Sequence, residues 1–219
     1  MITLLVDNKK FTVAAGTNLL KACLDHDIYI PNLCYMEGMD HPPASCRLCF
    51  VEIEGEEHPI PACTVQIRTG LVVKTESPRV RRLQKTALQL LLSVHHVDCR
   101  NCPANRKCAL QNMAKFLNVG LKPKRFDLFL KQVQIDQRHP FLDYYPNRCV
   151  LCGRCVQVCR DRNNPAQLTF AERGFDTVIS FFVNSESPSP SCDTCRACIE
   201  VCPVAAILPK QIDTGPQTH

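Results

Sequence analysis

Glycine is scarce in this chain, which has only eight among 219 residues, and no G-x-G-x-x-G motif follows a predicted strand. The glycines of that motif allow the backbone to approach a pyrophosphate closely at the start of a helix. The sequence therefore excludes a dinucleotide or flavin loop of this kind, and we expect no NAD- or flavin-binding residues in the chain.

Long apolar segments are also lacking. Hydrophobic residues make up 45% of the chain and charged residues 21%, and no run approaches the roughly 20 apolar residues that a membrane-spanning helix needs. Residues 1–7, MITLLVD, have neither the basic segment nor the small-residue cleavage site of a secretory signal. We therefore expect a cytoplasmic protein without a membrane span.

Cysteine, in contrast, is abundant, and fifteen of the sixteen cysteines fall into three spacing groups. The groups are Cys34, Cys46, Cys49 and Cys63; then His95 with Cys99, Cys102 and Cys108; and then Cys149, Cys152, Cys155 and Cys159 with Cys192, Cys195, Cys198 and Cys202. Tight C-x2-C repeats without an export signal favour metal ligation over disulfides. Cys23 lies outside the groups, on the apolar face of a predicted helix, and is interpreted as a small core residue.

The last group carries the strongest signal, because it contains two C-x2-C-x2-C-x3-C runs that begin at Cys149 and Cys192. In two-cluster ferredoxins, three closely spaced thiolates bind one cubane and the fourth cysteine of the run binds the other. This predicts one [4Fe-4S] cluster on Cys149, Cys152, Cys155 and Cys202, and a second on Cys159, Cys192, Cys195 and Cys198. Zinc rarely uses two four-cysteine runs. Arg160 replaces the usual proline after the first run.

The first group, Cys34-x11-Cys46-x2-Cys49-x13-Cys63, is less specific. It differs from the plant-type C-x4-C-x2-C spacing. A [2Fe-2S] cluster is still favoured over structural zinc. The four cysteines lie on loops of a small predicted sheet, and the cysteine groups that follow them are cluster motifs.

The middle group is ambiguous by itself. Three thiolates and one histidine can hold tetrahedral zinc as readily as a [4Fe-4S] cluster. His95 and His96 are both candidates for the histidine ligand. A neutral imidazole in place of a thiolate would make the cluster less negative and raise its reduction potential.

Hydrophobic periodicity predicts an α+β chain. We expect strands at 2–6, 11–14, around 51–53 and at 71–75, with a helix capped by Thr17 or Asn18, which together form a β-grasp pattern. A helix from Pro78 to about Val94 follows, 110–140 is expected to be helical, and 175–183 is expected to be a strand. The apolar stripe predicted for the helix at 78–94 consists of Val80, Leu83, Ala87, Leu90, Leu91 and Val94.

Four segments follow from this pattern. They are a β-grasp [2Fe-2S] domain at 1–76, a helical [4Fe-4S] domain with one His and three Cys ligands at 77–138, a two-cluster ferredoxin-like domain at 139–208 and a tail at 209–219. The formal charge of +5 does not indicate nucleic-acid binding, because four clusters with their ligand thiolates would contribute about −7.

The order of these motifs is similar to one iron–sulfur segment, which recurs in several oxidoreductases. It resembles the segment shared by the 75-kDa-type subunit of respiratory complex I, iron-only hydrogenases, some NAD-linked formate dehydrogenases and the diaphorase small subunit of soluble NAD-reducing hydrogenases. The resemblance covers about residues 1–208, includes Arg173-Gly174 and Ser191-Cys192, and implies that His95, separated from Cys99 by three residues, is the ligand.

Most members of this family continue into a large catalytic domain, so the chain resembles the diaphorase small subunit most. The resemblance implies an electron-transfer subunit without catalytic residues of its own, between a flavin- and NAD-binding diaphorase subunit and the small and large subunits of a [NiFe]-hydrogenase. A nickel–iron site would need four further thiolates, and only Cys23 remains. The alternatives are the equivalent subunit of a formate dehydrogenase or an electron-bifurcating complex, a free-standing multicluster ferredoxin and a zinc-stabilised scaffold.

Overall fold

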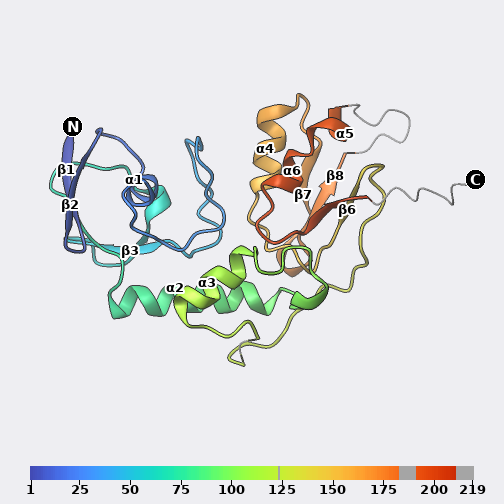
Figure 1. Cartoon of the computed structure of the whole chain (residues 1–219), viewed down its shortest axis with the longest axis horizontal. Coiled ribbons are helices and arrows are strands. Elements are labelled where there is room, and N and C mark those ends of the chain that lie inside the picture. Colours follow the sequence, from blue (N-terminus) through green and yellow to red (C-terminus); the bar gives the residue numbers. More distant parts are fainter. Residues whose placement is uncertain (123, 183–190, 211–219) are drawn as a thin grey trace, which may run out of the picture.

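The computed structural model describes residues 1–122, 124–182 and 191–210 (Figure 1). It contains both helices and sheets, as the sequence predicts, so the mixed α+β class is confirmed. Most of the expected tail after Pro209 lies outside the described residues.

The N-terminal unit is a five-stranded sheet with one helix packed on it. The strands follow the order β2-β1-β5-β3-β4, with β1 antiparallel to β2 and parallel to β5. The elements are β1 (Ile2–Val6), β2 (Lys9–Val13), α1 (Leu19–Asp25), β3 (Phe50–Ile53), β4 (Ile60–Pro61) and β5 (Val72–Lys74), with a 3-10 helix at Ala62–Thr64. Leu4 and Val6 alternate toward the core, where Leu20 and Cys23 of α1 are fully buried.

Asn18 caps α1, which resolves the choice between Thr17 and Asn18. The Asn18 Oδ1 atom accepts a hydrogen bond from the Lys21 backbone N–H at 3.2 Å, while its Nδ2 atom donates to the Cys63 carbonyl at 2.6 Å. One side chain thus closes the helix end and fixes the loop that carries Cys63. The Thr17 hydroxyl donates instead to the Ala14 carbonyl.

Helix α2 (Pro78–Ser93) begins as predicted, with the Ser77 Oγ atom accepting a hydrogen bond from the Val80 N–H. The predicted apolar stripe is partly wrong, because Leu90 is 50% exposed and Gln84 is fully buried. The Gln84 Nε2 atom donates to the Phe50 carbonyl at 3.1 Å, which satisfies its polar group inside the core.

The helix predicted over 110–140 is correct only as far as Leu117. Helix α3 (Ala109–Leu117) ends at Asn118, which adopts a left-handed φ of 51°, and the Val119 N–H then bonds to the Ala114 carbonyl. This hydrogen bond closes the helix end, and Gly120 and Pro123 follow in the sequence. The segment beyond is irregular where described and is held by a bond from the Phe129 N–H to the Ser93 carbonyl.

The C-terminal unit contains two small antiparallel sheets and short helices. Its elements are β6 (Leu142–Tyr144), α4 (Arg154–Arg162), β7 (Leu168–Ala171), β8 (Val178–Phe181), α5 (Ser191–Cys195), α6 (Ala197–Glu200) and β9 (Ile207–Pro209), with a 3-10 helix at Gly174–Asp176. β6 pairs with β9 and β7 with β8. The strand expected at 175–183 is thus shorter, and its last residue lies outside the described residues.

Helices α2 and α3 lie along the base of both units (Figure 1). One buried cluster connects the three parts, because Leu33 and Leu48 from the N-terminal unit share it with Met113 of α3 and Val156 of α4. Cys34 and Cys46 belong to the same buried cluster as Cys149 and Cys155, whereas Cys49 and Cys63 belong to the separate core of the N-terminal sheet.

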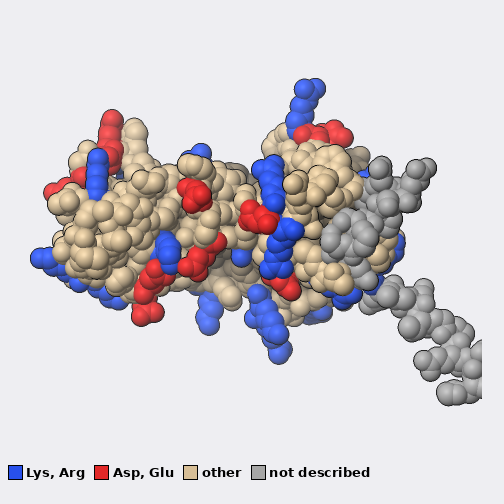
Figure 2. Space-filling view, turned by 90° about the horizontal axis from the view of Figure 1, so that it is seen from above, with Lys and Arg blue, Asp and Glu red and all other residues tan. Residues whose placement is uncertain are grey.

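No helix among the described residues is both long and apolar enough to cross a membrane. On the face shown in Figure 2, the Lys and Arg side chains lie among Asp and Glu side chains. This face does not present the continuous basic surface that is typical of nucleic-acid binding.

Candidate iron–sulfur centres

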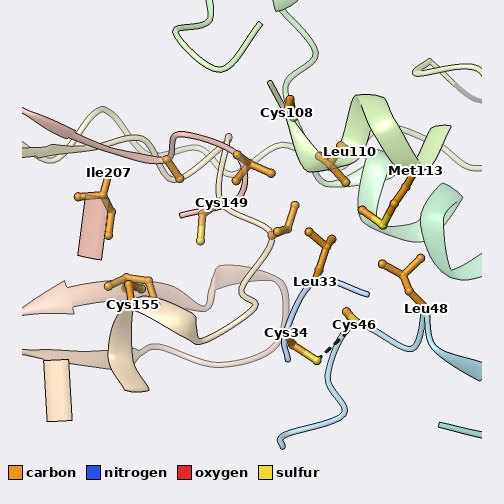
Figure 3. Close-up of a cluster of buried hydrophobic side chains, with 14 of the residues drawn as sticks. Leu33, Cys34, Cys46, Leu48, Cys108, Leu110, Met113, Cys149, Cys155 and Ile207 are labelled. Carbon is orange, nitrogen blue, oxygen red and sulfur yellow. Dashed lines mark hydrogen bonds between the residues drawn. The ribbon is translucent and has the colours of Figure 1, made fainter. Parts of the chain in front are cut away.

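The first four cysteines are buried and lie together. The Cys34 and Cys46 sulfur atoms are 3.4 Å apart (Figure 3). Hydrogen bonding between the two thiols lowers the pKa of Cys34, and hydrogen bonding between the Cys49 and Cys63 thiols lowers the pKa of Cys63. Each pair therefore stabilises one thiolate, which is the form that binds a metal.

The C-x2-C turns bring neighbouring cysteines to the same side through residues with positive φ. Arg47, Leu151, Gly153 and Arg196 each lie between two of the predicted ligands and have φ values of 52°, 52°, 78° and 45°. Only glycine adopts this region without steric cost. Left-handed backbone at the three other residues is the kind of local strain that occurs at functional sites.

The structure separates the roles of the two adjacent histidines. His95 is 8% exposed, and its Nδ1 atom lies 2.8 Å from the Arg148 carbonyl. A carbonyl only accepts hydrogen bonds, so Nδ1 carries the proton and Nε2 keeps the lone pair that can bind a metal. The side chain of His96 is exposed. This arrangement favours His95 as the ligand.

The three cysteines of this group lie around the start of α3. Cys99 belongs to a 3-10 helix at Cys99–Asn101, and Cys108 occupies the N-cap position of α3. Burial raises the pKa of Cys108, with smaller contributions from the charges of Cys102 and Cys99. The charges of Cys99 and Cys102 act on Cys108, so these three thiols lie near one another. Among the described residues, no hydrogen bond connects His95 to them.

The C-terminal cysteines interact across the two runs. Burial is the largest of the effects that raise the pKa of Cys152 to about 12, and the charges of Cys149 and Cys202 raise it further in the same direction. Cys202 thus lies with the first run although it belongs to the second. It accepts a hydrogen bond from the Ala206 N–H at 3.2 Å.

Cys159, the last cysteine of the first run, lies in turn with the first three cysteines of the second run. Burial raises the pKa of Cys198 to about 12, and the charge of Cys159 contributes next, followed by Cys192 and Cys195. The same four cysteines line one pocket. The fourth cysteine of each run is therefore near the first three of the other.

Several of these sulfur atoms accept backbone hydrogen bonds. The Leu151 N–H donates to Cys149 at 3.4 Å, and the Gln167 N–H donates to Cys159 at 3.2 Å. Hydrogen bonds to the ligand sulfurs are among the features that set the reduction potential of iron–sulfur clusters. The backbone N–H donors of this unit therefore suit cysteine thiolates that bind a cluster.

Two buried arginine atoms strengthen this fit. The Arg148 Nη1 atom and the Arg154 Nε atom are buried without a hydrogen-bond partner among the described residues. Both residues precede predicted ligands, and the charge of Arg154 lowers the pKa of Cys152. The unpaired Arg154 donor beside Cys152 is accounted for by a negatively charged group next to that thiol.

The thiols do not form a closed site for one ion. Within the described part of the chain, no three His, Cys, Asp or Glu side chains converge as the ligands of a single metal ion do. All sixteen cysteines are described, and none forms a disulfide. Cys23 is fully buried in the α1 core, where burial raises its pKa to about 12.

Three family models match the chain in sequence order. Residues 1–78 match a 2Fe-2S iron–sulfur cluster binding domain, residues 84–121 match the NADH-ubiquinone oxidoreductase-G iron–sulfur binding region, and residues 139–208 match the ferredoxin-like domain of NADH-quinone oxidoreductase subunit 3. Regions for both cluster types are therefore present.

Curated relatives share this arrangement. The chain is 35% identical over 212 residues to an NADH-quinone oxidoreductase subunit of Rhizobium meliloti, covering 95% of this chain and 24% of the relative. It is 31% identical over 217 residues to NADP-reducing hydrogenase subunit HndD of Solidesulfovibrio fructosivorans, covering 95% of this chain and 36% of the relative. The chain thus spans about a quarter to a third of the length of these relatives.

A solved structure matches over a comparable length. It is a crystal structure of an NAD+-reducing [NiFe]-hydrogenase in the H2-reduced state, with a TM-score of 0.84 and 29% sequence identity, covering all of this chain and 90% of the matched chain. These matches confirm the resemblance stated from the cysteine motifs. Over nearly its whole length the chain is therefore similar to part of an NADH-quinone oxidoreductase subunit and of an NADP-reducing hydrogenase subunit, and to one chain of an NAD+-reducing [NiFe]-hydrogenase.

Proposed function

We propose that the chain transfers single electrons between a flavin- and NAD(H)-binding subunit and the small and large subunits of a hydrogenase, which together catalyse H2 + NAD+ → NADH + H+. The observation that carries this proposal is the match along the whole chain to one subunit-length chain of an NAD+-reducing hydrogenase. Thiolates that bind clusters must stay reduced, and a cytoplasmic location supplies such a reducing compartment.

We assign one [2Fe-2S] and three [4Fe-4S] clusters to the chain. The ligand sets are Cys34, Cys46, Cys49 and Cys63 for the [2Fe-2S] cluster, and His95, Cys99, Cys102 and Cys108; Cys149, Cys152, Cys155 and Cys202; and Cys159, Cys192, Cys195 and Cys198 for the [4Fe-4S] clusters. The sheet order and the position of α1 support a β-grasp domain around the first set. The proposed domain limits are 1–76, 77–138 and 139–208.

Iron–sulfur clusters exchange one electron at a time, whereas NAD accepts a hydride, so a flavin on another subunit is needed to couple the two. The residues of this chain hold the clusters in a largely buried interior and neutralise part of their charge. Arg154 supplies positive charge beside Cys152, and Arg148 supplies it beside His95.

The cluster assignment predicts about 14 iron atoms per chain, with a similar amount of acid-labile sulfide. Iron and sulfide analysis of the anaerobically reconstituted full chain measures both. A stoichiometric zinc content with less than half of that iron would instead support the zinc-stabilised scaffold.

The isolated chain is expected to oxidise neither NADH nor H2, because it lacks a dinucleotide loop and a flavin site, although a strong chemical reductant should reduce its clusters. Addition of the flavoprotein subunit should allow NADH to reduce them, and addition of the hydrogenase pair should couple that reduction to hydrogen. NADH-dependent dye reduction by the pure chain with bound flavin would contradict the proposal. Coupling to a formate dehydrogenase module alone would support the alternative partner.

A further inference from the structure

A small pocket in the C-terminal unit contains a histidine that belongs to none of the cysteine motifs. Four predicted ligands of one [4Fe-4S] cluster line this pocket, which we call the second-run pocket: Cys159, Cys192, Cys195 and Cys198. His139 lines the same pocket and is only 4% exposed. A polar side chain is thus buried in the wall of a predicted cluster site.

The end of β9 holds the backbone around His139. The Lys210 N–H donates a hydrogen bond to the Phe141 carbonyl at 2.8 Å, and the Lys210 Nζ atom donates to the His139 carbonyl at 3.4 Å. The centroid of the His139 ring lies 4.9 Å from that of the Phe181 ring of β8 and 6.0 Å from that of Phe141. Contacts to the backbone and to the ring therefore hold this side chain in place.

A hydrogen bond to the ring fixes the tautomer of His139. The Phe141 N–H donates to the His139 Nδ1 atom at 3.2 Å. A backbone N–H can only donate, so Nδ1 carries no proton, and the proton of the neutral ring is on Nε2. Burial lowers the pKa of His139, and the charge of Lys210 lowers it further, which agrees with a neutral ring.

The Nε2–H group of His139 is a donor that lacks a protein acceptor. In the part of the chain that the structure describes, Nδ1 is the only atom of this ring that makes a hydrogen bond. Buried donors are rarely left unpaired. A cluster in the second-run pocket would bring sulfur acceptors to the cavity that His139 lines.

We propose that His139 donates a hydrogen bond from Nε2 to a sulfur atom of the cluster in the second-run pocket and thereby raises the reduction potential of that cluster. Reduction adds negative charge to the cluster and its sulfurs, so a hydrogen-bond donor stabilises the reduced state more than the oxidised state. This inference rests on the proposed ligand set.

The first test compares His139→Phe with the parent chain, both at full length and reconstituted anaerobically. Phenylalanine retains a ring beside Phe181 but removes the donor. An EPR-monitored redox titration should show one [4Fe-4S] signal shifted to a more negative midpoint potential, and this should be the signal that Cys198→Ala removes. His139→Gln retains an N–H donor and should lie closer to the parent chain.

His26→Phe is the matched control for the loss of an imidazole. The His26 ring also stacks on a phenylalanine, with its centroid 4.1 Å from that of Phe11, but it belongs to the N-terminal unit. This variant should leave the midpoint potential of the cluster in the second-run pocket unchanged.

Pulsed EPR of the reduced parent chain, labelled with ¹⁵N-histidine, tests the hydrogen bond directly. The signal that Cys198→Ala removes should show a weakly coupled ¹⁵N nucleus and a proton that exchanges with deuterium. His139→Phe should lose both couplings, which a role in packing alone would not produce. If His139→Phe fails to assemble the cluster, the couplings in the parent chain decide the matter.

An unchanged midpoint potential in His139→Phe, with full iron and sulfide, would overturn the role of His139 while leaving the proposed function intact. Equal shifts in His139→Phe and His139→Gln would assign the effect to packing of the ring, and absence of both couplings from the parent chain would show that no hydrogen bond forms; either result would also overturn the proposal. A parent chain without clusters would instead refute the proposed function, and with it this inference.

Discussion

Replacing Cys202 with alanine is expected to remove the cluster held by the first cysteine run, not the cluster next to its own run. Cys202 lies among Cys149, Cys152 and Cys155, whose pKa values its charge helps to raise. A cubane that loses one of four thiolates is expected to be lost or degraded, so iron should fall by about four atoms per chain. Iron analysis and EPR of the reduced variant measure the loss.

The pattern of losses among four variants separates crossing from independent runs. Cys202→Ala and Cys149→Ala should lose the same EPR signal, and Cys198→Ala and Cys159→Ala should lose the other. Cys23→Ala is the control for deletion of a buried thiol and should retain every cluster. Shared loss by Cys202→Ala and Cys198→Ala would show that each run binds its own cubane.

Prediction from sequence works best where one short pattern carries the geometry. The cap at Ser77 was predictable, because a serine before a proline at the first helical position is a local signal. The spacing of the two C-terminal runs likewise predicts that each fourth cysteine crosses, and the structure places Cys202 beside Cys149 and Cys152.

Prediction failed where distant contacts decide the outcome. The predicted apolar stripe includes Leu90 and not the polar Gln84, yet a carbonyl of β3 satisfies Gln84 inside the core and Leu90 is exposed. The hydrogen bond from the Ile179 N–H to the Tyr144 hydroxyl has no sequence signature either, because Tyr144 belongs to β6 and Ile179 to β8, which lie in different sheets.

Replacing His95 with alanine is expected to remove the [4Fe-4S] cluster of the middle domain, whereas His96→Ala should retain it. Burial and the hydrogen bond from Nδ1 to the Arg148 carbonyl hold the His95 ring in one orientation with Nε2 available, and the exposed His96 has no such constraint. Iron content should therefore fall by about four atoms per chain in the first variant only. His96→Ala is the matched control, because it deletes an imidazole at the adjacent position.

A third variant, His95→Cys, tests ligation itself. A cysteine at this position should retain the cluster but replace a neutral imidazole with an anionic thiolate, which lowers the reduction potential because the reduced state gains a further unfavourable negative charge. An EPR-monitored redox titration measures the shift. Loss of the cluster in His96→Ala, together with an unchanged potential in His95→Cys, would reverse the choice of ligand. A full iron content in His95→Ala and His96→Ala alike would show that neither imidazole binds the cluster.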